Sequence, residues 1–236
     1  MVYWTCCGIG ILQEGGTVMS SLEDMLKGYE IPEVVKIRTI FDRTRLEKPE
    51  ETLLERLREK DLPVLPGQRI AITGGSRGIA DYVALMRAAV RYLKEKGAVP
   101  FIVPAMGSHG GATAEGQVEV LRNLGITEDS VGAPIISSME VVEIARTELD
   151  LPVYLDKNAW EADGILLLNR VKTHTSIYGR CQSGLVKMLA IGLAKHVGAA
   201  MMSSITSFTF CASTSFTFCA STSFTNFLSF QVNSTF

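Results

Sequence analysis

A short apolar run, residues 165–168, is followed by polar residues and then by a loop that contains glycine and serine. An apolar run of this length, bounded by turn-forming residues, is typical of a strand that is buried on both faces. The loop after it carries His174. The pattern therefore predicts a central strand that leads directly into a loop with an ionisable side chain.

The spacing of apolar residues changes to that of a helix after this loop. Beyond Ser183 and Gly184, apolar or small residues recur three or four positions apart. They are Leu185, Met188, Leu189, Gly192 and Leu193. This spacing predicts a helix with Ser183 as its N-cap and Lys187 in its first turn. Because the helix dipole disfavours a cation there, Lys187 either points into solvent or supplies an amine that is needed neutral and reactive.

The rest of the chain alternates between strand and helix patterns. Strands are expected at residues 34–41, 69–73, 99–103, 134–137, 141–145 and 153–155. Helices are expected from Pro49, over residues 79–96 and over residues 113–124. This alternation predicts an α/β fold, a single Rossmann-like domain with a mainly parallel sheet, right-handed crossovers and helices on both faces.

Three of the expected strands end in loops that carry a distinctive polar residue. Arg77 follows the strand at 69–73, His109 follows the one at 99–103, and His174 follows the run at 165–168. In an open parallel sheet the loops at the carboxyl ends of the strands share one edge, where ligands bind. An isolated histidine is more often structural than catalytic. Two histidines in matching loops, together with an arginine, predict a functional site at this edge.

Composition narrows the class of protein. The chain has 236 residues, of which 47% are hydrophobic, and a formal net charge of −2. These values fit a globular α/β protein and argue against nucleic acid as a partner. The five cysteines have neither disulfide-framework nor CxxC spacing, which favours a reducing cytoplasm. Residues 1–12 are apolar but too short to span a membrane, so we expect no membrane partner. The oligomeric state stays open.

Two motifs resemble the N-terminal domain of the nickel-pincer lactate racemase family and its relatives. They are Asn169-Arg-Val-Lys-Thr-His174-Thr and Ser183-Gly-Leu-Val-Lys187-Met-Leu. The resemblance spans about residues 30–202. The interval between His174 and Lys187 is longer than in the racemase proper, which places the chain among the relatives.

The resemblance implies racemisation or epimerisation of a small 2-hydroxy acid, such as lactate, by reversible hydride transfer to the cofactor. It implies that His174 is one of two acid/base histidines, and His109 matches the other by position. Arg77 is retained in a loop that lacks the family's aspartate. Arg77 is then expected to grip the substrate carboxylate, and a solvated surface arginine is the alternative.

The cofactor implied by the resemblance is a nickel-pincer nucleotide. Lys187 is the residue that would be joined to it covalently, with Ser183 and Gly184 beside it. Ser203 occupies the position of the family's remaining nickel-ligating histidine. We therefore expect no protein-derived metal ligand at that position and doubtful nickel occupancy.

A glycine loop at residues 73–79 is similar to the nucleotide loop of short-chain dehydrogenases, which makes an NAD(P)-dependent oxidoreductase a further alternative. Tyr92 and Lys96 even supply that family's Tyr-x-x-x-Lys motif. Both lie on the helix that directly follows the loop, near its far end. In addition, Ala80 stands where that family has glycine.

The two ends of the chain have unusual composition. Residues 196–236 contain no Asp, Glu, Lys or Arg, and an eight-residue repeat, Thr-Ser-Phe-Thr-Phe-Cys-Ala-Ser, occurs twice without change. We predict that residues 203–236 are a low-complexity tail, disordered or frame-shifted, and that residues 1–18 are a non-native upstream extension. Residues 19–202 then form the racemase-like domain. A truncated, non-catalytic domain is the competing interpretation.

Overall fold

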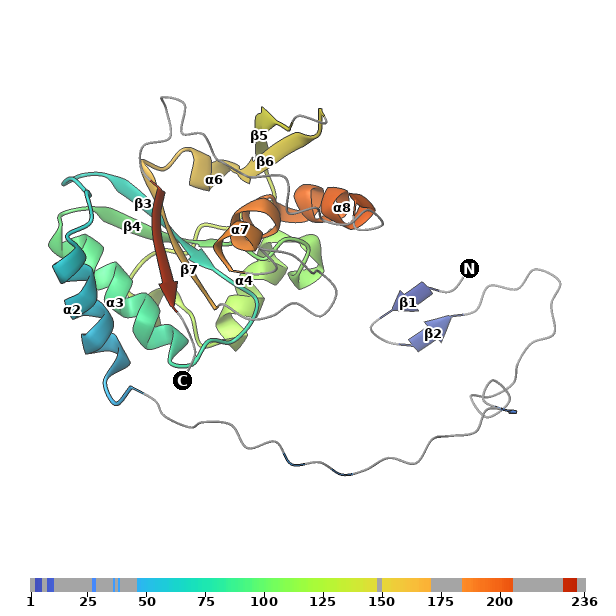
Figure 1. Cartoon of the computed structure of the whole chain (residues 1–236), viewed down its shortest axis with the longest axis horizontal. Helices are drawn as coiled ribbons and strands as arrows, with labels where there is room; N and C mark the ends of the chain where they lie inside the picture. The colour runs from blue at the N-terminus through green and yellow to red at the C-terminus, as the bar shows by residue number, and fades with distance from the viewer. Residues whose placement is uncertain are drawn as a thin grey trace. The chain divides into compact units, whose positions relative to one another are not determined.

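The chain divides into two units, Met1–Asp42 and Arg43–Phe236. The computed structural model describes residues 3–5, 8–10, 27–28, 36, 38, 46–147, 150–170, 184–205 and 227–232. In the first unit, β1 (Tyr3–Thr5) and β2 (Gly8–Gly10) form an antiparallel ribbon (Figure 1). The other helices and strands described below belong to the second unit.

A parallel sheet forms the centre of the second unit (Figure 1). Its strands are β3 (Arg69–Gly74), β4 (Val99–Pro104), β7 (Gly164–Arg170) and β8 (Phe227–Val232). Their order is β4-β3-β7-β8, so β8, from the predicted tail, pairs with the outer side of β7. β3 and β4 pair along their whole length, and Gly74 lies opposite Pro104. Both strands therefore end at the same level of the sheet.

Helices and one hairpin surround this sheet. The helices are α2 (Pro49–Lys60), α3 (Tyr82–Glu95), α4 (Ala114–Asn123), α5 (Glu128–Val131), α6 (Lys157–Trp160), α7 (Leu185–Lys187) and α8 (Lys195–Ile205). A 3₁₀ turn, η1 (Gly110–Ala112), precedes α4, and a π-helix, η2 (Met188–Leu193), joins α7 to α8. β5 (Val141–Arg146) and β6 (Pro152–Asp156) form the antiparallel hairpin. In the described part of the chain, no helix has the length and apolar character needed to cross a membrane.

One face of the sheet packs against α2 and α3. Ile70 and Ile72 of β3 contribute to this core, and Leu85 and Leu93 of α3 are buried in it. α3 presents an apolar stripe because its apolar residues recur at helical spacing. Each such side chain stabilises the fold by about 1.5–3 kcal/mol when it is fully buried.

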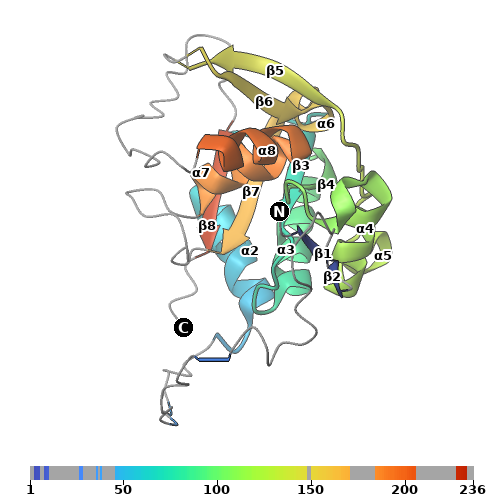
Figure 2. The same ribbon diagram turned by 90° about the vertical axis from the view of Figure 1, so that its right-hand side faces the viewer.

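The other face packs against η2, α6 and β6. Because successive strand residues point to opposite faces, Ala71, Ile165 and Leu167 belong to this second core. Leu155 of β6 and Leu193 of η2 are buried with them. Figure 2 shows α7 and α8 beside the β5–β6 hairpin, in agreement with the contacts that β6 makes with η2 and α8.

Most of the expected elements are confirmed, including the strands at 69–73, 99–103 and 165–168 and the helices at 79–96 and 113–124. The strand expected at 134–137 is wrong, since only an isolated bridge joins Ile135 to Ile102. The strands expected at 141–145 and 153–155 exist, but they pair with each other outside the parallel sheet. Their short connection cannot make the crossover that parallel strands need. The strand expected at 34–41 lies outside the described residues, apart from residues 36 and 38.

Candidate functional site

Two loops leave the carboxyl edge of the sheet side by side. One follows β3 and carries Arg77, and the other follows β4 and carries His109. The backbone N–H of Ala105 donates to the carbonyl of Gly74 at 2.7 Å, so the pairing of the two strands continues into the start of the second loop. This edge is where ligands bind in open parallel sheets, which makes it the candidate site.

The loop after β3 is fixed at its first turn. The backbone N–H of Gly75 donates to the hydroxyl of the buried Tyr82, at 2.7 Å. A Cβ atom built on Gly75 would lie 3.4 Å from the Cε atom of Met188, so this loop lies directly beside η2. Arg77 follows two residues later and is exposed. The loop therefore presents a cationic side chain from an anchored backbone.

The loop after β4 makes a tight turn at His109. Gly110 and Gly111 have φ values of +67° and +66°, a conformation that favours glycine. A Cβ atom on Gly110 would lie only 2.5 Å from the carbonyl carbon of Gly116, so the turn packs closely on the start of α4. His109 is partly exposed at this turn.

Lys187 lies on α7, which leads into the η2 helix that contacts both loops. Gly184 precedes α7 with φ 90° and ψ −145°, which only glycine adopts without strain. Lys187 is half-buried at the end of α7, where η2 begins. The backbone N–H of Gly107 donates to the carbonyl of Gly192 at 3.1 Å, which ties the His109 loop to η2. π-Helical turns of this kind occur often at functional sites.

Arg77 and Lys187 both lie close enough to His109 to affect its pKa. The pKa of His109 is lowered, chiefly because its partial burial disfavours the imidazolium form. The positive charges of Arg77 and Lys187 lower that pKa further. The imidazole is therefore neutral at neutral pH and lies within range of two cations. Such an arrangement can bind an anion and accept a proton from it.

The structure thus brings Arg77, His109 and Lys187 together at one edge. Gly184 lies directly before the helix of Lys187. His174 and Ser183 lie outside the described residues, so their roles stay predictions. Gly184 rather than Ser183 is the N-cap of α7.

Several buried polar residues around this edge were not predicted from the sequence. Gln117, Asp156 and Lys195 are each 0% exposed, and Asn169, at the end of β7, is 5% exposed. The Oδ1 atom of Asn169 has no hydrogen-bond donor among the described residues. No pattern in the sequence marks these residues. The sequence feature that comes nearest to indicating a buried polar residue is Lys195, a charged residue within an otherwise apolar stretch.

Tyr92 and Lys96 serve the packing of α3 on α2. The hydroxyl of Tyr92 accepts from the backbone N–H of Leu62 at 2.8 Å, and Tyr92 is 2% exposed. The Nζ atom of Lys96 donates to Asp61 at 2.7 Å. The pair lies at the end of α3 remote from the glycine loop, which gives no support to a dehydrogenase site.

A nickel-pincer group fits this site only in part. Lys187 is suitably placed for a covalent link, because it is half-buried and acts electrostatically on His109. Ser203 lies in α8, and a neutral hydroxyl is a poor nickel donor compared with an imidazole. Among the residues that the structure describes, no three His, Cys, Asp or Glu side chains gather to hold a metal ion.

Compared with models of protein families and with curated proteins, the sequence gives no significant match.

Proposed function

We propose that the chain is a relative of the lactate-racemase-type isomerases and that its carboxyl-edge site binds a small 2-hydroxy acid. The proposal includes the assignment of the α/β fold to a single Rossmann-like domain. The convergence of Arg77, His109 and Lys187 at one sheet edge supports it most directly. A 2-hydroxy acid offers a carboxylate to the cations and a hydroxyl proton to a neutral imidazole.

The role of each residue follows from its charge and position. The Arg77 guanidinium can hold both carboxylate oxygens through two parallel hydrogen bonds. The ammonium of Lys187 adds a second positive charge where no covalent link has formed. His109 is neutral at neutral pH, so it can take the hydroxyl proton when C2 is oxidised to the keto level and return it in the reverse step.

Racemisation also requires a hydride acceptor, which in the resembled family is the nickel-pincer nucleotide. The donor set of this chain does not complete that group, because Ser203 replaces the expected histidine. This observation favours a second candidate function, a domain that binds the acid without catalysing its isomerisation. Both candidates share the same binding site and differ only in the redox step.

A binding titration of the full chain tests the shared part. Isothermal titration with lactate, and with propionate as the analogue that lacks the hydroxyl, should show tighter binding of lactate. Arg77→Met should weaken lactate binding by a factor of roughly 10–100, since a charge-assisted hydrogen bond contributes about 1.5–3 kcal/mol. Arg56→Met is the matched control, because Arg56 is an exposed residue of α2 that pairs with Glu59. Equal binding of lactate and propionate would refute recognition of the hydroxyl, and equal lactate affinity in Arg77→Met and Arg56→Met would refute the acid-binding site.

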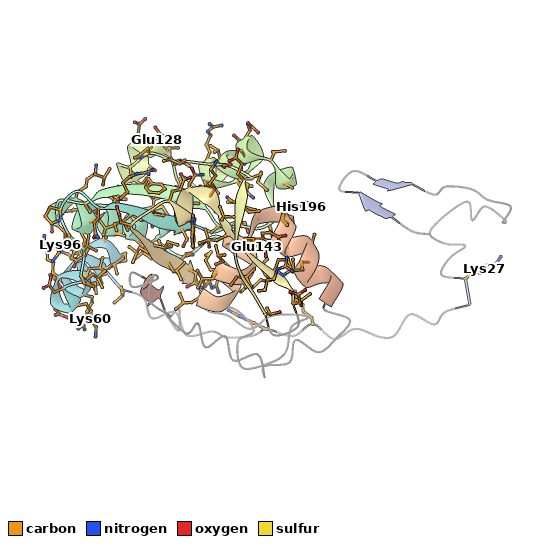
Figure 3. All side chains as sticks on the ribbon, turned by 90° about the horizontal axis from the view of Figure 1, so that it is seen from above. Lys27, Lys60, Lys96, Glu128, Glu143 and His196 are labelled. Carbon is orange, nitrogen blue, oxygen red and sulfur yellow. The ribbon has the colours of Figure 1, made fainter. Side chains whose placement is uncertain are left out.

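A racemisation assay separates the two candidates. The chain is produced together with the enzymes that build the pincer cofactor, and the two lactate isomers are resolved by chiral chromatography. Interconversion that is lost in His109→Gln, but kept in His196→Gln, supports the isomerase. His196 is a suitable control because it is exposed on α8, as labelled in Figure 3. Lactate binding without interconversion supports the binding domain.

We also propose a cytoplasmic location. The five cysteines include an adjacent pair, Cys6 and Cys7, and lack the spacing of a disulfide framework.

A further inference from the structure

Lys195 is a buried cation beneath the candidate site. It is 0% exposed and opens α8 with a φ of 54°, which is unusual for a residue other than glycine. An isolated ammonium group is costly to bury, so a buried lysine requires partners for its charge and for its hydrogen bonds.

Three acceptors surround the Nζ atom of Lys195. It donates to the carbonyl of Pro104 at 2.6 Å and to Oε1 of Gln117 at 3.1 Å, and it forms an ion pair with Oδ2 of Asp156 at 3.0 Å. The ammonium group thus makes two hydrogen bonds and one ion pair, and the contact with Oδ2 of Asp156 is electrostatic, since that oxygen accepts no hydrogen bond among the described residues. Burial lowers the pKa of Lys195, and the charge of Asp156 opposes this effect. The geometry fits the charged form.

Gln117 extends this arrangement to the His109 loop. Its Nε2 atom donates to the carbonyl of Gly107 at 2.8 Å and to that of His109 at 3.4 Å. The orientation of the amide is set at both ends, because an ammonium only donates and a carbonyl only accepts. A continuous polar chain therefore runs from Asp156 through Lys195 and Gln117 to the backbone of His109.

Asp156 joins the polar chain to the β5–β6 hairpin and to α6. It ends β6 and caps α6, accepting from the backbone N–H of Ala159 at 3.0 Å. Pro104, in turn, is the last residue of β4. Lys195 thus connects the end of β4, α4 and the β5–β6 hairpin at the point where η2 meets α8.

We propose that Lys195 and Gln117 are positioning residues that hold the His109 loop against η2 and so set the distance of the imidazole from Arg77 and Lys187. The inference rests on the proposed role of His109 in acid binding. Neither residue contacts the substrate. Their effect passes through the carbonyls of Gly107 and His109, two acceptors that Gln117 occupies together.

The wild-type protein gives the first test. In a ¹H–¹⁵N spectrum tuned to lysine side chains, one ammonium signal should persist at room temperature, because burial, two hydrogen bonds and an ion pair slow its exchange with water. That signal should show a nuclear Overhauser contact to the side-chain amide of Gln117. If the signal or the contact is absent, the proposal fails, whatever the variants do.

Variants then test the effect on His109. Gln117→Met and Lys195→Met remove the donor and the cation while keeping similar side-chain lengths. In an NMR titration, the pKa of His109 should rise toward its ordinary value of 6.5, and lactate should bind roughly tenfold more weakly. Leu57→Ala is the control, since it removes a buried side chain of α2 and lowers stability without touching the polar chain.

The outcomes separate this inference from the proposed function. An unchanged His109 pKa in folded Gln117→Met and Lys195→Met, or an equal shift in Leu57→Ala, overturns the positioning role. If His109 responds as expected but lactate does not bind to the wild type, the proposed function fails and the positioning role stands. If both variants unfold, the wild-type ammonium signal and its contact to Gln117 decide.

Discussion

The hydroxyl of Tyr82, the first residue of α3, accepts a hydrogen bond from the backbone N–H of Gly75 at 2.7 Å. This contact closes the glycine loop that carries Arg77 against the helix that follows it. Tyr82 is 4% exposed, and its burial raises the pKa of the phenol to about 12. The contact therefore links the geometry of the site to the alkaline stability of the fold.

We predict that Tyr82→Phe changes how stability depends on alkaline pH. The unfolded chain releases the phenol proton near pH 10, whereas the folded chain keeps it until about pH 12. Between these values the unfolded state binds fewer protons, so stability falls as pH rises, by about 3 kcal/mol in total. Tyr82→Phe removes this loss, but at neutral pH it leaves the Gly75 N–H unpaired, at a cost of about 1–3 kcal/mol.

Urea unfolding followed by circular dichroism, at several pH values from about 8 upward, checks this prediction. The stability difference between wild type and Tyr82→Phe should be largest below pH 10 and should shrink above it. Leu57→Ala should keep a constant difference from wild type over the same range. A constant gap for Tyr82→Phe would contradict the buried, neutral phenol.

A second prediction concerns the charges around His109. Arg77→Met and Lys187→Met should each raise the pKa of His109, because each removes a positive charge that disfavours the imidazolium. Both effects should diminish in molar sodium chloride, which screens exposed charges. NMR titration of the His109 ring measures them, and Arg56→Met should leave the value unchanged. If neither site variant moves the pKa, the three side chains do not share a site.

A third prediction uses the contact between η2 and the end of β4. A Cβ atom on Gly192 would lie 2.6 Å from the carbonyl oxygen of Ala105, which is backbone and cannot easily move. Gly192→Ala should therefore lower the free energy of unfolding by about 1–3 kcal/mol and shift the His109 resonances. Gly78→Ala is the matched control, because its nearest neighbour would be a Leu124 methyl group at 3.8 Å. Similar stability of the two variants would show that η2 can move away from β4.

The sequence predicted the central strands well because their pattern has one physical cause. β3 and β4 are buried on both faces after their first residue, and β7 is buried up to its last residue, Arg170, which requires the apolar runs that are visible in the sequence. The pairing of β5 with β6 was not predicted, although their short connection is visible in the sequence. Their alternating pattern fits any half-buried strand, and only the short connection between Arg146 and Pro152 decides for a hairpin.

Arg77 and His109, the exposed residues of the candidate site, could be singled out from the sequence. Lys195, which is buried beneath them, could not. Arg77 and His109 stand in glycine-containing loops after recognisable strands, and those signals are local. Lys195 instead depends on acceptors that lie 78 and 91 residues away in the sequence, at Gln117 and Pro104. No local sequence pattern predicts these contacts, because lysines are usually exposed and only the fold places acceptors around this one.

The last prediction concerns metal. A pincer complex needs a further donor from the protein, and an imidazole suits nickel far better than the serine hydroxyl expected at position 203. We predict that the chain, produced with the cofactor-building enzymes and purified by gel filtration, holds clearly less than one nickel per monomer. Ser203→His should raise the nickel content, whereas Ser204→His, at the neighbouring position of α8, should not. Adding Lys187→Met to either variant should abolish its nickel content, because this change removes the residue that would be joined to the cofactor. Elemental analysis measures each variant, and a full equivalent of nickel in the unmodified chain would show that another residue supplies the donor.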